Sequence, residues 1–197
     1  MNQNQYSDDL AHIRTMMERS SRFLSLSGWA GILPCIFALI GLAMAVWFIS
    51  KAQNFWWFGN EIDRSSPLTL QLIAIAMIVL GLSIFSSWYT CMRKARKENQ
   101  STWTPAIRNM LVHFTIPLTA GAIMVGWIYV KGEWGLLAPV MLSFYGLALI
   151  QVSQFTLKTV FWLGIIEIAL SIPSGIPGLG IPMLAVGFGF AHIVYGI

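Results

Sequence analysis

The sequence predicts an all-α protein, a polytopic transmembrane bundle of six helices preceded by an N-terminal amphipathic interfacial helix. Only 10% of the 197 residues are charged and 56% are hydrophobic, whereas soluble domains carry about 25% charged residues. Six apolar stretches each approach the roughly 20 residues that cross a bilayer. Lys and Arg gather in segments on one side of these stretches, as the positive-inside rule requires.

The first predicted element, residues 1–23, is a cytoplasmic amphipathic helix. Ser7 can cap it, and the two aspartates that follow complement the helix dipole. Apolar residues then recur at steps of three and four, while Arg19 and Arg22 lie on the opposite face. Such a helix lies on the membrane surface and either anchors the chain or docks a partner.

Residues 24–197 form the predicted transmembrane domain. Pro67 and Pro105 mark two helix starts, because each follows a hydroxyl residue that can cap a helix and proline is favoured in the first turn. Three prolines and three glycines in residues 171–182 predict a break that cannot continue a helix. This break is either a plain turn or a segment that re-enters the bundle. The predicted spans are 24–50, 67–92, 108–130, 134–151, 155–172 and 177–197.

Basic residues predict the orientation of the bundle. With the N-terminus inside, nine Lys and Arg residues face the cytoplasm and three face outward, so both termini are expected in the cytoplasm. The net charge of +4 is therefore a topology signal, and no nucleic-acid partner is expected. Six of these residues are candidates for contact with anionic lipid headgroups or an acidic partner: Arg19, Arg22, Arg93, Lys94, Arg96 and Lys97.

One acid, Glu167, lies inside the apolar stretch of residues 161–170. An ionisable group is costly in hydrocarbon, so Glu167 is a candidate functional residue. Either it is protonated and hydrogen-bonds a neighbouring helix, or it takes up and releases a proton or binds a cation. Counted from the ends of the spans, Glu167 lies towards the outer side, whereas His113 and His192 lie towards the inner side. A direct Glu–His pair is therefore expected only if a helix is tilted or broken.

The two histidines at matched depth permit a bis-histidine haem b or metal site. No further metal ligand is apparent in the sequence, and no cofactor is predicted. The inner half also carries polar residues that either line a cytoplasm-facing pocket or bond back to their own helices. They are Ser83, Ser87, Thr90, Thr115, Thr119, Gln151 and Gln154.

Small residues predict close packing of helices, either within the bundle or between protomers. They are Gly31, Gly41, Ala185 and Gly189. In addition, residues 21–28 (SRFLSLSG) and 187–196 (GFGFAHIVYG) resemble a set of uncharacterised small bacterial inner-membrane proteins. The resemblance covers the two ends of the chain more than its middle. It implies a multi-span protein of the bacterial cytoplasmic membrane with no known activity, and no functional residue is transferred.

No H-E-x-x-H, C-x-x-C or G-x-S-x-G motif is present, so an enzyme is not favoured. We expect a non-enzymatic subunit or regulator of a membrane protein complex. Its partners would be the lipid bilayer and either other membrane proteins or further copies of the chain. The alternative is a small oligomeric transporter or channel, proton-coupled through Glu167. A third hypothesis is a haem- or metal-binding membrane protein.

Overall fold

The computed structural model describes residues 28–52, 67–97 and 105–196, and this part of the chain is all-helical, as predicted. The predicted N-terminal amphipathic helix, with Arg19 and Arg22, lies outside the described residues. The helices are α2 (Gly28–Ala52), α3 (Pro67–Lys97), α4 (Pro105–Lys131), η1 (Trp134–Leu136), α5 (Leu137–Val152), α6 (Lys158–Ser174), α7 (Gly180–Ala185), the π-helical η2 (Val186–Ala191) and α8 (His192–Gly196).

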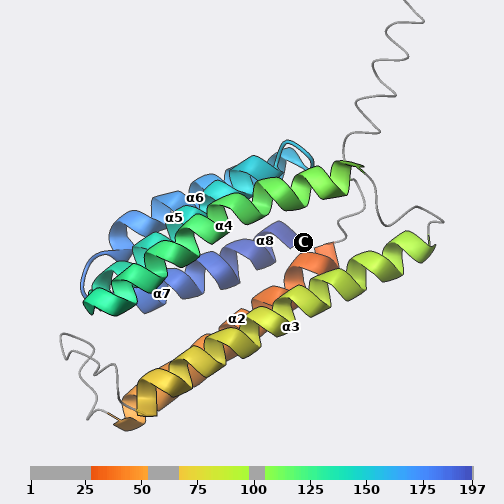
Figure 1. Ribbon diagram of the computed structural model, residues 1–197. Coiled ribbons are helices and arrows are strands. Elements are labelled where there is room, and N and C mark those ends of the chain that lie inside the picture. Colours follow the sequence, from red (N-terminus) through yellow and green to blue (C-terminus); the bar gives the residue numbers. More distant parts are fainter. Residues whose placement is uncertain (1–27, 53–66, 98–104, 197) are drawn as a thin grey trace, which may run out of the picture.

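The helices form two groups joined by the C-terminal helices (Figure 1). Helices α2 and α3 are an antiparallel pair, and α5 packs between α4 and α6. Helices α7, η2 and α8 follow one another along nearly one axis between the two groups, and α2 contacts all three. The α2–α3 pair is therefore joined to the rest of the described structure chiefly through α2.

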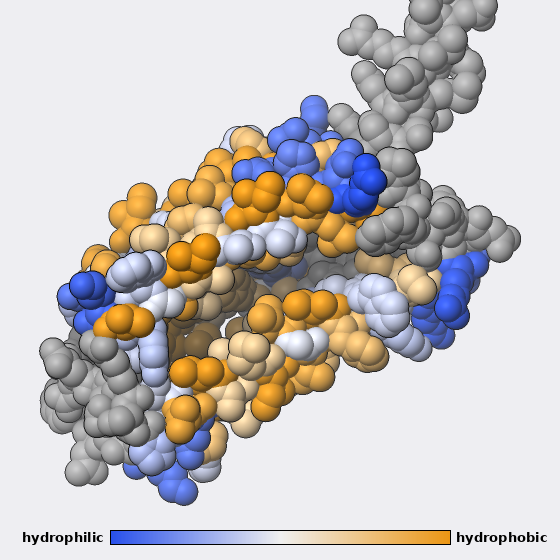
Figure 2. Space-filling model, in the orientation of Figure 1, coloured by the Kyte–Doolittle hydropathy of each residue, from blue (hydrophilic) through white to orange (hydrophobic). Residues whose placement is uncertain are grey.

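Four helices are long and apolar enough to cross a membrane, at Ile32–Lys51, Pro67–Arg93, Ile107–Lys131 and Trp134–Val152. Large apolar side chains cover their outer surfaces, including Trp47, Leu70 and Trp127, and orange apolar side chains extend over much of the face in Figure 2. An apolar exterior of this extent is typical of a protein whose solvent is lipid. The remaining two predicted spans correspond to α6 and to the run Gly180–Val194, which are shorter.

The predicted break before the last helix is shorter than the sequence indicates. Helix α6 continues through Pro173 to Ser174, and only residues 175–179 form a turn. Gly178 has a φ of 84° in this turn, a left-handed conformation that glycine adopts without steric cost. Pro182 lies in the first turn of α7, where its missing N–H costs no helical hydrogen bond. The expectation that residues 171–182 cannot continue a helix was therefore too broad.

Glycines allow helices to approach closely at several contacts. A Cβ atom on Gly41 of α2 would collide with Val79 of α3, and one on Gly189 would collide with Leu39 of α2. The predicted packing residues Gly41 and Gly189 thus face neighbouring helices of the same chain. Ala185 is half-buried in α7, and Gly31 lies in α2.

Another of these contacts joins α5 to α6. A Cβ atom on Gly146 would lie 2.6 Å from the carbonyl oxygen of Gly164, and one on Gly164 would lie 2.7 Å from the carbonyl oxygen of Gly146. The two backbones therefore touch where the helices cross, which is the arrangement that small residues permit between membrane helices. This close crossing brings α5 against the face of α6 that carries Glu167.

Candidate functional site

Glu167 of α6 is fully buried, with 0% of its surface exposed. Glycines on two neighbouring helices make room for it. A Cβ atom on Gly187 of η2 would collide with Oε2 of Glu167, and one on Gly146 of α5 would lie 3.1 Å from its Cβ atom. Leu142 of α5, also fully buried, lies beside the same part of η2. The carboxyl group therefore lies in the interior of the described bundle, among α5, α6 and the last helix.

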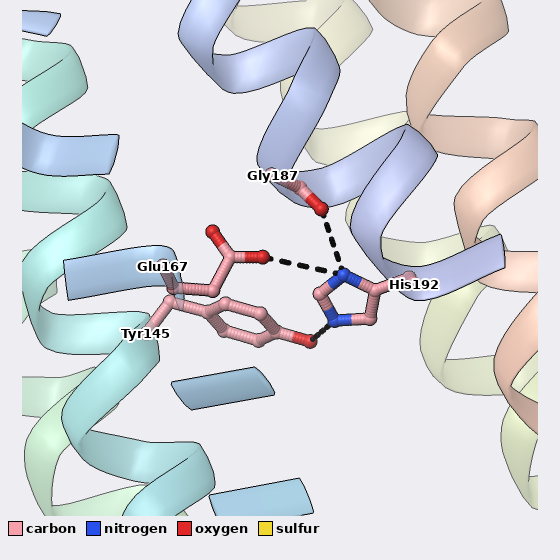
Figure 3. Close-up of polar contacts among 4 residues, drawn as sticks. All are labelled: Tyr145, Glu167, Gly187 and His192. Atoms are coloured by element: carbon pink, nitrogen blue, oxygen red, sulfur yellow. Dashed lines mark hydrogen bonds and ion pairs between the residues drawn. The ribbon is translucent and has the colours of Figure 1, made fainter. Parts of the chain in front are cut away.

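His192 connects Glu167 to two further groups (Figure 3). Its Nδ1 atom lies 3.3 Å from Oε1 of Glu167 and 2.9 Å from the carbonyl oxygen of Gly187. Its Nε2 atom lies 2.7 Å from the hydroxyl oxygen of Tyr145. The side chain of His192 is buried as well. A carboxyl, an imidazole and a phenol from α6, α8 and α5 thus form one cluster, named here the Glu–His–Tyr cluster.

The partners of His192 determine which ring nitrogen carries the proton. The carbonyl oxygen of Gly187 only accepts hydrogen bonds, so Nδ1 must be protonated to bond with it. In a neutral imidazole Nε2 is then an acceptor, and the hydroxyl of Tyr145 donates to it. In an imidazolium Nε2 also carries a proton, and the same hydroxyl then accepts a hydrogen bond from Nε2–H. Tyr145 can therefore stabilise both protonation states of His192.

Neither carboxyl oxygen of Glu167 has a hydrogen-bond partner among the described residues. The 3.3 Å approach of Nδ1 is an ion-pair distance, but the proton on Nδ1 is directed towards Gly187. A buried carboxylate without donors is unstable, because its lost hydration is not replaced. Two arrangements avoid this cost, a protonated Glu167 beside a neutral imidazole and an ionised Glu167 beside an imidazolium.

The pairing of Glu167 with His192 contradicts the expected separation of the two residues. Helix α6 extends beyond Ile172 to Ser174, which places Glu167 deeper than the predicted span implies. Side chains on a helix point towards its N-terminus, so the ring of His192 reaches back to the level of Gly187. The last helix is also interrupted by the π-helical turn η2 directly before His192, which is the kind of break that the pairing required.

His113 does not belong to this cluster. Its side chain is exposed on α4, and its ring centroid lies 5.2 Å from that of Phe155. Both ring nitrogens of His192 already have protein partners, and the described residues contain no group of three or more metal-binding side chains. The bis-histidine haem b hypothesis stays a prediction that this geometry does not favour.

The polar residues of the predicted inner pocket are distributed over several surfaces. The hydroxyl of Thr90 donates to carbonyl groups of its own helix at Ser86 and Ser87, and that of Thr119 donates to Thr115. This back-bonding is the alternative that the sequence left open. Thr115, Thr119 and Gln154 are exposed, whereas Ser83, Ser87 and Gln151 are half-buried. A pocket that includes all seven residues stays a prediction.

The candidate basic residues that the structure describes lie at the C-terminal end of α3. Arg93, Arg96 and Lys97 are exposed there, and Lys94 is on the same helical turn. Figure 2 shows hydrophilic side chains at the two ends of the apolar bundle rather than along it. This distribution suits headgroup contact at a membrane surface.

Sequence reasoning missed Tyr145 and the glycines around Glu167. The available signal was a hydroxyl and a glycine, Tyr145 and Gly146, side by side within an apolar stretch. No family model matches the chain, and comparisons with curated proteins and with solved structures find no match. The chemistry of the Glu–His–Tyr cluster itself is therefore the basis on which a function can be assigned.

Replacing Tyr145 by phenylalanine is expected to destabilise the protein by about 1–3 kcal/mol, because the buried Nε2 atom of His192 loses its partner. Thermal unfolding in detergent, followed by circular dichroism, measures the effect. Tyr129→Phe is the matched control, since the half-buried Tyr129 ring packs edge-on against Trp134, with ring centroids 5.7 Å apart, and does not belong to the cluster. Equal losses in the two variants would contradict the assigned role of Tyr145.

Proposed function

We propose that this chain is a small proton-coupled transporter of a bacterial cytoplasmic membrane, with the Glu–His–Tyr cluster as its proton site. The observation that carries the proposal is the fully buried carboxyl of Glu167, which faces His192 while both of its oxygens lack a hydrogen-bond partner among the described residues. Ionisable groups inside membrane bundles are typical of proton relays in pumps and transporters.

In the proposed arrangement α6 and the last helix also cross the membrane. This adds two spans to the four long apolar helices and leaves both termini in the cytoplasm. The positive-inside distribution of Lys and Arg supports this orientation. Glu167 then lies near the middle of α6, where a charge is most costly.

The energetics of the cluster explain how a proton is coupled to movement. While the cluster holds its proton, the charges balance as a protonated Glu167 beside a neutral imidazole, the arrangement that fits the Nδ1–H bond of His192 to Gly187. Loss of that proton leaves a buried, uncompensated carboxylate, which is strongly unfavourable. Release is therefore expected only after the site opens to water or a cationic solute replaces the proton. This requirement links proton release to a change of conformation.

The arrangement of helices provides a place for such a change. Figure 2 shows that one face of the molecule is hollowed between α4 and the α2–α3 pair, with the C-terminal helices at the floor. Because the α2–α3 pair is joined to the remainder chiefly through α2, this hollow can widen or narrow without separating α4, α5 and α6. We assign the solute pathway to it.

The test uses purified protein in vesicles that contain a pH-sensitive dye. Cations, amino acids, sugars and drugs are supplied outside in turn, and the internal pH is recorded. One solute class is expected to change the internal pH in wild-type vesicles. Glu167→Gln is expected to reduce the initial rate by about a hundredfold or more, the scale on which removal of a general acid–base group acts.

Glu133→Gln is the control for this assay, because Glu133 is an exposed acid in the turn before η1. It should transport at the wild-type rate. Two results would overturn the proposal: a wild-type protein that moves no protons with any solute, or a Glu167→Gln variant as active as wild type.

A non-enzymatic subunit or regulator is the second candidate function, and a specific feature of α4 favours it. Thr115, Thr119, Ala122 and Gly126 are all exposed at steps of four, three and four, and a Cβ atom on Gly126 would meet no other atom within 4 Å. Such a row of small residues suits close packing against another membrane helix. Stoichiometric partner chains in protein extracted with mild detergent would favour this candidate over a lone transporter.

A further inference from the structure

We infer that Gly187 is a positioning residue of the proton site. Its carbonyl oxygen accepts a hydrogen bond from Nδ1–H of His192 while Glu167 is protonated. When Glu167 is ionised, Nδ1–H donates to Glu167 instead. The π-helical turn η2 transmits this exchange to α2. The inference rests on the proposed function. Its new part is that η2 couples the protonation state of Glu167 to the position of the α2–α3 pair.

The first step follows from one donor facing two acceptors. Nδ1 of His192 lies 2.9 Å from the Gly187 carbonyl oxygen and 3.3 Å from Oε1 of Glu167 (Figure 3). A hydrogen bond to an ionised acceptor is roughly twice as strong as one between neutral groups. Ionised Glu167 therefore takes the donor away from Gly187. Protonated Glu167 is uncharged, so Nδ1–H of His192 donates to the Gly187 carbonyl oxygen again.

Gly187 permits this competition because it has no side chain. A Cβ atom at this position would collide with Oε2 of Glu167 and lie 2.8 Å from Leu142. The carboxyl group and the Gly187 carbonyl can therefore both reach His192. Gly187 also lies within η2, and π-helical turns of this kind occur frequently at functional sites.

Few other groups can influence this exchange. Tyr145 of α5 bonds to Nε2 of His192, and Cys35 of α2 is a further buried ionisable side chain. Glu167 and His192 are the acidic and basic residues that are buried among the described residues. The charge in this part of the interior is therefore determined by the pair itself.

The second step passes from η2 to α2. Gly189 lies in the same π-helical turn as Gly187, and a Cβ atom there would collide with the side chain of Leu39 of α2. Conversion of a π turn to an α turn removes the bulge and shifts the following residues by about one residue, or 1.5 Å along the axis. Because Leu39 packs on this turn, such a shift would displace α2, which belongs to one wall of the hollow in Figure 2.

The sequence offers a selective probe of both glycine carbonyls. Gly–Phe dipeptides occur only at positions 187–188 and 189–190. Protein labelled with carbonyl-13C glycine and 15N phenylalanine therefore gives two carbonyl–nitrogen cross peaks in solid-state NMR of membrane samples. Phe190→Leu, a change at a largely exposed side chain, removes the Gly189 peak and so assigns both.

We expect the Gly187 carbonyl peak to move by more than its linewidth as the sample is titrated across the midpoint of proton binding, with the Gly189 peak moving alongside it. In Glu167→Met, which lacks the competing acceptor, both peaks should stay at their acid positions at every pH. Peaks that do not move in an active wild-type transporter would overturn this inference and leave the proposed function intact. A moving Gly187 peak with a fixed Gly189 peak would overturn the transmission to α2.

Discussion

Gly146→Ala is expected to destabilise the protein by about 3 kcal/mol, the upper end of the range for overpacked cores. The added methyl group would lie 2.6 Å from the carbonyl oxygen of Gly164 and 2.7 Å from Ile168. A flexible side chain can rotate away from a new methyl group, but a backbone carbonyl within a helix cannot. Helices α5 and α6 must therefore move apart, and the packing around Glu167 is lost with their crossing.

Thermal unfolding of detergent-solubilised protein tests this result, with Gly81→Ala as the matched control. Gly81 lies within α3, and a Cβ atom there would meet no other atom within 4 Å. The control should be unchanged or slightly more stable, because alanine favours a helix over glycine by up to about 1 kcal/mol. If Gly146→Ala unfolds at the same temperature as Gly81→Ala, the close backbone contact between α5 and α6 is contradicted.

Glu167→Met is expected to increase the stability of the protein by about 1–3 kcal/mol while abolishing proton coupling. Both carboxyl oxygens of Glu167 are buried without hydrogen-bond partners in the described structure, and an unsatisfied buried polar group carries a desolvation cost of this size. Methionine is similar in length, unbranched and apolar, so it can occupy the same space beside Gly187. A gain in stability with a loss of function indicates that Glu167 is retained for its chemistry.

The same unfolding assay and the vesicle assay together decide between the two roles that the sequence allowed for Glu167. Glu133→Met, at the exposed turn before η1, should alter neither stability nor proton coupling appreciably. A Glu167→Met variant that is clearly less stable than wild type would show that the carboxyl group holds the bundle together. That result would favour the structural role.

The helical membrane character of this protein could be predicted because it depends on properties that are local along the chain. Long apolar stretches must form helices in lipid, since each backbone N–H and C=O group has to bond within its own segment. The structure accordingly has four helices long and apolar enough to cross a membrane, and α3 and α4 begin at Pro67 and Pro105. Glu167 could be singled out for a similar reason, because a lone acid in an apolar stretch is costly wherever the helix lies.

The cluster itself could not be predicted, because it depends on how separate helices meet. Counting residues from the ends of straight spans placed Glu167 and His192 at different depths, whereas the π-helical turn and the backward direction of the His192 side chain bring them to 3.3 Å. The contact of Gly146 with Gly164 joins two helices by shape rather than by any local pattern. Composition and periodicity therefore predicted that lipid surrounds the protein, that the chain is helical and that Glu167 is the candidate acid. Only tertiary packing decided its partners, because hydrogen bonds and close contacts between helices are set by distances that a linear sequence does not contain.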